Sequence, residues 1–241
     1  MTAVLFGPEH DLKRLSVTRK CKRNRPLTQF LSTIKDILTM NIDFSAQDRK
    51  KIEDGIRGKF AKVAVNPEGL FRYPTGRAGL EGLKYDPDIL QALPESALES
   101  FCGVGNPFSL GEIHERESVL DIGCGGGVDA MVAAVMVGAA GKVVGVDMSS
   151  EMVDRARQNL SYTNLKNASF RESSAEDLPF PDEDFDVVIS SGVFNLIPDK
   201  LKALREVFRV TKPGGRLMMA DQVLTGHLPE DIKARVDTWA R

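Results

Sequence analysis

The chain has 241 residues, of which 42% are hydrophobic and 27% are charged, and 32 basic residues stand against 34 acidic ones. This composition is typical of a globular protein and excludes a fibrous or wholly disordered chain. A formal net charge of −2 argues against a protein that works mainly by neutralising nucleic-acid phosphates.

The sequence contains neither a predicted membrane span nor a predicted disulfide framework. No run approaches the roughly 18 to 20 uncharged apolar residues of a spanning helix, and the first residues lack the pattern of a secretory signal. The three cysteines, Cys21, Cys102 and Cys124, are widely spaced and form no CxxC metal motif. We therefore expect a cytoplasmic protein with reduced thiols and no metal site.

Residues 1–44 are predicted to be a basic N-terminal extension. Between Asp11 and Arg25, seven basic residues accompany one acidic residue. Such a run is typical of a tail that binds nucleic acid or an anionic membrane, or of a solvated, poorly ordered segment. We favour the poorly ordered segment, because no aromatic residue is interleaved for base stacking.

Residues 45–116 are predicted to be a helical cap or lid. Ser45 and Asp48 form an S-x-x-D capping pattern, which is followed by apolar residues at helical spacing: Ile52, Ile56, Phe60 and Val63. An amphipathic helix is expected there. The stretch from Pro67 to Tyr85 is rich in Gly and Pro, so we predict a loop that is either a surface connection or a lid over a site.

Beyond Glu117, short apolar runs alternate with helical stretches. The runs predicted as buried strands are Ser118–Ile122, Lys142–Val146, Ala168–Arg171, Asp186–Ser190 and Arg216–Ala220. The predicted helices between them are Asp129–Val137, Ser150–Leu160 and Lys200–Val210. This alternation indicates βαβ crossovers, so residues 117–241 are expected to form an α/β domain with a doubly wound, mostly parallel sheet.

The turn after the first of these strands has the sequence Asp121-Ile122-Gly123-Cys124-Gly125-Gly126-Gly127. In a doubly wound sheet, ligands bind at such a turn, where glycines allow close approach to the backbone. Two ligand signatures overlap here. The run from Gly125 to Ala130 fits the dinucleotide pattern G-x-G-x-x-A, with Asp147 at the distance of a ribose-binding acid. The run from Asp121 also fits D-x-G-x-G-x-G, so the glycines alone leave both cofactors open.

Elsewhere the chain resembles the class I S-adenosylmethionine-dependent methyltransferases, at Val143–Asp147, Ser174–Phe180, Phe185–Val188 and Lys212–Leu217. The resemblance implies a Rossmann-like fold and S-adenosyl-L-methionine as cofactor. It implies cofactor contacts at Asp121, Gly123, Gly125 and Gly127 for the methionine end, Asp147 for the ribose, and Met148, Ala175, Glu176 and Ser190 around the adenosine. Methyl transfer from a sulfonium requires no dedicated acid or base, so no catalytic residue is assigned.

A closer resemblance is to the arsenite methyltransferase group. It is carried by Gly103–Pro107, Val144–Met148, Val188–Lys200 and Leu228–Ile232. Members of that group bind trivalent arsenic through cysteine thiolates, because a soft centre prefers soft ligands. Two of the group's cysteines align with Val104 and Gly192, and a third would follow Trp239 just beyond the last residue. The acceptor is therefore expected to be a small molecule, with arsenite not assigned.

Class I methyltransferases continue after the fifth strand with a helix and a terminal hairpin. This chain ends within that helix, so we expect a C-terminally incomplete domain that lacks the hairpin. The run Leu217–Ala220 would then form an exposed apolar edge, through which two chains could pair into a homo-oligomer. The leading hypothesis is a methyltransferase without membrane or nucleic-acid partners. A non-catalytic S-adenosylmethionine-binding protein and an NAD-dependent oxidoreductase are the alternatives.

Overall fold

The computed structural model describes residues 2–6, 15–16, 44–222, 236–237 and 239. Most of the basic stretch from Asp11 to Arg25 and most of the helix expected at Val236–Arg241 lie outside these residues. The described strands form one sheet in the order β2-β1-β7-β6-β3-β4-β5. Their bounds are β1 (Thr2–Phe6), β2 (Leu15–Ser16), β3 (Ser118–Ile122), β4 (Lys142–Asp147), β5 (Ala168–Glu172), β6 (Phe185–Ser191) and β7 (Thr211–Asp221).

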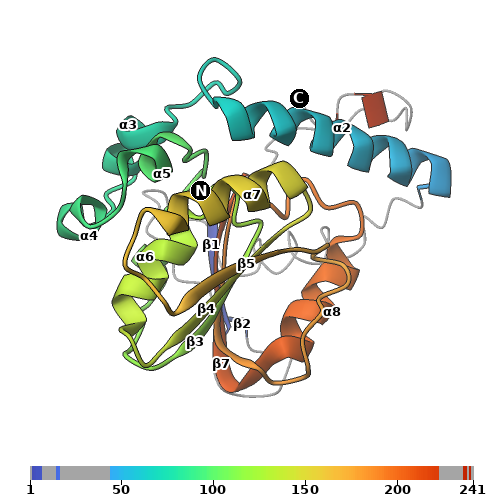
Figure 1. Cartoon of the computed structure of the whole chain (residues 1–241). Helices are drawn as coiled ribbons and strands as arrows, with labels where there is room; N and C mark the ends of the chain where they lie inside the picture. Colours follow the sequence, from blue (N-terminus) through green and yellow to red (C-terminus); the bar gives the residue numbers. More distant parts are fainter. Residues whose placement is uncertain (1, 7–14, 17–43, 223–235, 238, 240–241) are drawn as a thin grey trace, which may run out of the picture.

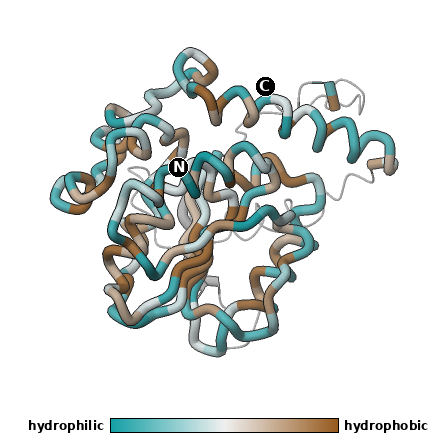
Figure 2. The backbone as a smooth tube through the Cα atoms, viewed as in Figure 1, coloured by the Kyte–Doolittle hydropathy of each residue, from teal (hydrophilic) through white to brown (hydrophobic). Residues whose placement is uncertain are grey.

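Strands β3 to β7 are parallel and carry helices on both faces (Figure 1). One face is covered by α6 (Val128–Val137) and α7 (Ser150–Ser161), and the other by α8 (Lys200–Val210). Successive side chains of a strand point to opposite faces of the sheet. Val119 therefore packs in the hydrophobic core on the face of α6 and α7, the first core, and Leu120 in the core on the face of α8, the second core. Figure 2 shows that the central strands are hydrophobic, whereas α2, α7 and α8 carry many hydrophilic residues. The predicted doubly wound α/β fold is confirmed.

The predicted helix after Ser45 is confirmed as α2 (Ala46–Val65), which lies along α7 above the end of the sheet (Figure 1). The Ser45 hydroxyl accepts the backbone N–H of Asp48 at 3.1 Å, as the capping pattern predicts. The buried residues Ile52, Ile56 and Val63 form its inner face. This packing places α2 over the carboxyl ends of the strands.

The chain after α2 contains four short helical segments, of which the first lies within the predicted loop Pro67–Tyr85 and the others lie beyond it. They are α3 (Gly76–Gly82), α4 (Pro87–Gln91), α5 (Glu95–Glu99) and the 3-10 turn η1 (Pro107–Leu110). The loop prediction is wrong for α3, because packing overrides the low helix propensity of its glycines. Leu80 is fully buried, and a Cβ at Gly79 would overlap the carbonyl of Pro74. The glycines here allow the backbones to approach closely.

The edge of β7 is not exposed in the described structure. β1 pairs antiparallel with β7, with Thr2 opposite Asp221 and Leu5 opposite Met218, and β2 pairs with the outer side of β1. The expectation of an exposed edge at Leu217–Ala220 is therefore wrong, and the homo-oligomer that depended on this edge loses its basis. The backbone groups on this edge of β7 therefore pair with β1, which comes from the opposite end of the sequence.

None of the helices in the described part of the chain is long and apolar enough to cross a membrane.

Candidate active site

A cavity of about 550 Å³ opens at the carboxyl ends of β3, β4 and β6. One wall is the glycine turn that follows β3, with the ends of β4 and β6 beside it. The opposite wall comes from α2 and from the segment between α2 and α3. The residues of this second wall are Glu53, Ile56, Arg57, Lys59, Phe60, Leu70, Phe71, Arg72 and Tyr73. Segments distant in sequence therefore enclose one site at the position where doubly wound sheets bind ligands.

The glycine turn is held by the end of β4. The backbone N–H groups of Gly123 and Cys124 both donate to the Val146 carbonyl, at 2.8 and 2.9 Å. Gly123 has a φ of +69°, and a Cβ there would overlap the side chain of Val193. Gly125 has a φ of +52°. Only glycine fits this backbone without strain, and the turn therefore presents bare main chain to the cavity.

Three carboxylates surround the glycine turn: Asp121 and Asp129 are buried and Asp147 is half-buried. Asp147 lines the cavity and accepts the N–H of Gly125 at 3.0 Å and of Ser149 at 2.9 Å. Asp129, which also lines the cavity, accepts the hydroxyl of Tyr85 at 2.7 Å. Asp121 accepts the backbone amide of Ala130, while its Oδ2 is buried without a hydrogen-bond partner.

Burial raises the pKa of each of these carboxyl groups, and that of Asp129 reaches about 7. The charges of Asp129 and Asp147 raise the pKa of Asp121 further. A positively charged ligand would relieve this repulsion, whereas an anionic pyrophosphate would add to it. The residues present therefore fit S-adenosylmethionine, which carries an ammonium and a sulfonium, and do not fit a dinucleotide.

Six of the nine predicted cofactor residues line the cavity: Gly123, Gly125, Asp147, Met148, Ala175 and Glu176. The remaining three, Asp121, Gly127 and Ser190, lie behind its surface. Gly127 caps α6 and contacts the Phe170 ring, where a Cβ would lie 2.7 Å from a ring carbon. Ser190 is fully buried and donates its hydroxyl to the Ile122 carbonyl at 3.1 Å, while its neighbour Ser191 lines the cavity.

A polar network that sequence reasoning did not predict supports the glycine turn from behind. Asn159 of α7 is fully buried, and its amide nitrogen donates to the Gly126 carbonyl at 2.9 Å and to the Ser100 hydroxyl at 3.2 Å. Its amide oxygen accepts the Ser96 hydroxyl at 3.0 Å. Tyr85 braces Asp129 in the same way. Asn159 and Tyr85 are far from the turn in sequence, so no local pattern could have identified them.

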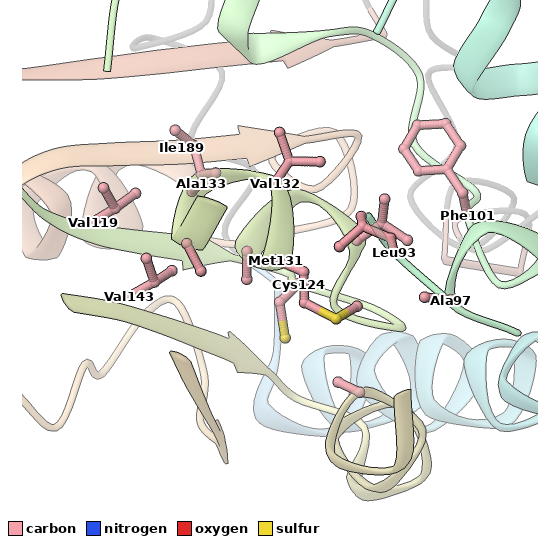
Figure 3. Packing of buried hydrophobic residues seen from close by; sticks show 14 of the residues in the cluster. Leu93, Ala97, Phe101, Val119, Cys124, Met131, Val132, Ala133, Val143 and Ile189 are labelled. Atoms are coloured by element: carbon pink, nitrogen blue, oxygen red, sulfur yellow. The ribbon is translucent and has the colours of Figure 1, made fainter. Parts of the chain in front are cut away.

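The positions that align with cysteines of the resembled group lie side by side in the cavity wall. A Cβ at Gly192 would lie 3.1 Å from Cγ1 of Val104. The thiols that do line the cavity are Cys102 and Cys124. Burial raises the pKa of Cys102 to about 12 and that of Cys124 well above its usual value, so both are protonated near neutral pH. Figure 3 shows Cys124 among the apolar side chains of the first core.

Within the described residues, no group of three or more His, Cys, Asp or Glu side chains could hold a metal ion.

The parallel sheet, the glycine turn and the anionic pocket together define a class I S-adenosylmethionine-dependent methyltransferase. The family model described as "Methyltransferase domain" matches residues 113–240, and the chain belongs to this family. S-adenosylmethionine is accordingly the cofactor of its class.

The relatives of this chain include arsenite methyltransferases. That of Halobacterium salinarum is 38% identical over 206 residues, covering 80% of this chain and 52% of its own length. That of Aquipseudomonas alcaligenes is 34% identical, covering 76% of this chain and 54% of its own length. The crystal structure of an arsenic (III) S-adenosylmethionine methyltransferase from Chlamydomonas reinhardtii is 32% identical, with a TM-score of 0.51, over 67% of this chain and 54% of that chain. The chain thus spans about half the length of these relatives.

Proposed function

We propose that this chain transfers the methyl group of S-adenosylmethionine to a small-molecule acceptor. The observation that supports this most is the position of three carboxylates, two of them buried, around a glycine turn at one end of the cavity. A cationic cofactor matches the first end. The second end is lined by aromatic rings and a lysine and is free to hold an acceptor.

The cofactor contacts follow from where each side chain lies. The backbone at Gly123 and Gly125 would hold the methionine end, and the unpartnered Oδ2 of Asp121 is available for the ammonium, directly or through water. Asp147 would accept the ribose hydroxyls, and Met148, Ala175 and Glu176 would border the adenine. Gly127 and Ser190 would shape the wall behind. When bound, the cofactor supplies an activated methyl group, and the chain binds it, orients it and excludes water.

The acceptor is proposed to be organic, although the relatives named above are arsenite methyltransferases. Trivalent arsenic is held best by thiolates, but Val104 and Gly192 contribute no sulfur. The two thiols of the cavity wall are protonated at neutral pH, which weakens them as soft ligands. Because reduced thiols persist in a reducing compartment, we also propose a cytoplasmic location.

Calorimetric titration tests the cofactor assignment against both alternatives. S-adenosylmethionine should bind and NAD should not. Asp147→Asn should weaken the binding of S-adenosylmethionine by about tenfold or more, because a charge-assisted hydrogen bond contributes about 1.5 to 3 kcal/mol. Asp154→Asn is the matched control, since Asp154 is exposed on α7 and pairs only with Arg157. Tighter binding of NAD than of S-adenosylmethionine would overturn the proposal.

Transfer of a radiolabelled methyl group to a panel of small acceptors, with arsenite and a thiol reductant among them, then separates an enzyme from a binding protein. Labelled product that is absent without acceptor supports the proposal. Tight cofactor binding without product from any acceptor would favour the non-catalytic alternative.

A further inference from the structure

The outer end of the cavity contains a cation that forms no ion pair with another described residue. Lys59 projects from α2, is half-buried, and has its nitrogen 4.9 Å from the centroid of the Phe71 ring. No acidic side chain of the described residues forms an ion pair with it. Its neighbour Arg57 lines the same cavity but is paired with Glu172 at 3.0 Å. An unpaired ammonium in a cavity favours an anionic ligand.

The walls beside this ammonium are aromatic and fixed in place. The rings of Phe71 and Tyr73 lie 5.1 Å apart at an angle of 39°. The Tyr73 hydroxyl donates to the Cys102 carbonyl at 3.0 Å, which anchors the ring against the segment leading to β3. Rigid aromatic walls suit a flat, unsaturated ligand body, because stacked and edge-to-face contacts need defined ring positions.

A second polar group in the cavity lining also has no partner. Asn195 follows β6, and its amide oxygen is buried without a hydrogen bond. A buried acceptor of this kind needs a donor from water or from a ligand. The cavity therefore offers a cation and aromatic surface at its outer wall, and an acceptor oxygen in the segment that follows β6.

We propose that the outer end of the cavity binds a phenol or an enol as its oxyanion, with Lys59 holding the negative oxygen. This assignment rests on the proposed methyl transfer and names its acceptor class. Asn195 would accept a hydrogen bond from a second hydroxyl or amine of the same molecule. Phe71 and Tyr73 would contact its unsaturated body.

The reaction balances without a further reactant. The acceptor hydroxyl loses its proton to solvent as it binds beside Lys59, and its oxygen lone pair then attacks the methyl carbon. An oxygen–carbon bond forms, the sulfur–carbon bond breaks, and the electron pair stays on sulfur. The products are a methyl ether and S-adenosylhomocysteine. Lys59 stabilises the nucleophile in this scheme and transfers no proton.

The ammonium of Lys59 shares the cavity lining with other titratable groups, which include Glu53, Arg57, Arg72, Tyr73, Cys102, Asp129 and Asp147. Burial raises the pKa of Tyr73 and of Cys102, so both stay neutral near pH 7. Burial lowers the pKa of Lys59 itself, which is expected of a partly desolvated ammonium without a fixed counter-ion. A bound oxyanion would restore the charged form.

The probe for this subsite is 4-nitrophenol, whose ionised form has its own visible absorbance. It is titrated with the full chain in the presence of saturating S-adenosylhomocysteine. We expect the pH midpoint of the bound probe to fall by about one unit or more, as an opposite charge within contact distance causes. Lys59→Met should abolish this shift, and Lys59→Arg should retain most of it. Lys62→Met is the matched control, because Lys62 is exposed on the same helix and does not line the cavity.

Two further probes separate the proposed class from other ligands. The methyl ether 4-nitroanisole keeps the ring without the anion, and acetate keeps the anion without the ring. Weaker binding of both than of 4-nitrophenol supports the proposal. Equal binding of 4-nitroanisole, or an unshifted midpoint in the unaltered chain, would overturn it.

The cofactor titration keeps this result separate from the proposed function. S-adenosylmethionine should bind to Lys59→Met with unchanged affinity, because Lys59 belongs to the outer wall. If cofactor binding and methyl transfer to another acceptor persist while the 4-nitrophenol midpoint does not move, only the acceptor class is wrong. If the unaltered chain binds no cofactor, the proposed function itself has failed.

Discussion

The hydrogen bond from Tyr85 to Asp129 should set the pH at which the cationic cofactor binds. Tyr85→Phe removes a 2.7 Å bond but keeps the ring, which packs 5.5 Å from Phe101 and 6.0 Å from Phe108 between centroids. Tyr85 is 5% exposed, so no water replaces the lost donor without rearrangement. The substitution therefore removes the hydroxyl donor of Asp129, together with the weaker contact of that hydroxyl to the Gly105 carbonyl at 3.2 Å.

The size of the effect follows from the energy of that bond. A hydrogen bond to a charged group contributes about 1.5 to 3 kcal/mol, which corresponds to about one to two pKa units. The pKa of Asp129, which is about 7 in the unaltered chain, should rise accordingly. At pH 7 the ionised fraction would fall from about one half to between about one tenth and one hundredth. If the cofactor requires the ionised form, its dissociation constant at pH 7 should increase by about 5- to 50-fold.

Calorimetric titration with S-adenosylmethionine between pH 6 and pH 9 measures this effect directly. The affinity of the Tyr85→Phe variant should recover at high pH and approach that of the unaltered chain. The burial that raises the pKa of Tyr85 keeps it protonated in this range, so it acts as a donor throughout. A loss of affinity that is the same at every pH, or no loss at all, would refute the reasoning and remove Asp129 from the cofactor's electrostatics.

Three other predictions concern the same turn. Gly123→Ala should destabilise the fold by about 2 to 5 kcal/mol in denaturant unfolding, from backbone strain plus overlap with Val193. Gly69→Ala should cost only about 1 to 2 kcal/mol, because Gly69 has a similar φ of +73° but open space around it. Equal losses of unfolding free energy in the two variants would show that the overlap with Val193 is relieved. Asn159→Ala should weaken cofactor binding as well as lower stability by about 1 to 3 kcal/mol, and a loss of stability alone would show that the turn does not depend on this brace. Without ligand, stability should fall as the pH rises from about 4 to about 7, because the folded chain keeps the proton of Asp129 over that range while the unfolded chain loses it. Asp129→Asn should flatten that profile. Thermal unfolding at each pH measures the profile, and a slope that the substitution leaves unchanged would contradict the prediction.

The sheet was predictable because parallel strands buried on both faces appear in sequence as short apolar runs. Strand β3 and helix α8 begin and end at the predicted residues. Helix α3 was missed because its stability comes from the burial of Leu80 and close backbone packing, not from local propensity. Strand β1 was missed because its partner, β7, lies at the opposite end of the chain.

The residues of the candidate site likewise fall into those that the sequence predicts and those that it does not. Gly123, Gly125 and Asp147 could be located from sequence because the two glycines lie in the turn after β3 and Asp147 ends β4. The carboxyl ends of parallel strands meet at one edge of the sheet. Tyr85 and Asn159 could not, because their functional contacts join residues 44 and 33 positions apart. Such contacts depend on how the cap packs against the sheet, which local patterns do not encode.

The two ends of the cavity come from different parts of the chain, which bears on how the acceptor is selected. The cofactor end is built from strand ends and the glycine turn, where a change such as Gly123→Ala disturbs the core of the fold. The outer end is built from α2 and the segment after it, where Lys59 and Phe71 are only partly buried. Substitutions in the cap can therefore alter the acceptor while the cofactor machinery stays intact. Val104 and Gly192 lie side by side in the cavity wall, so this part of the wall offers a ligand apolar surface and no sulfur, while the carboxylates around the turn stay the same.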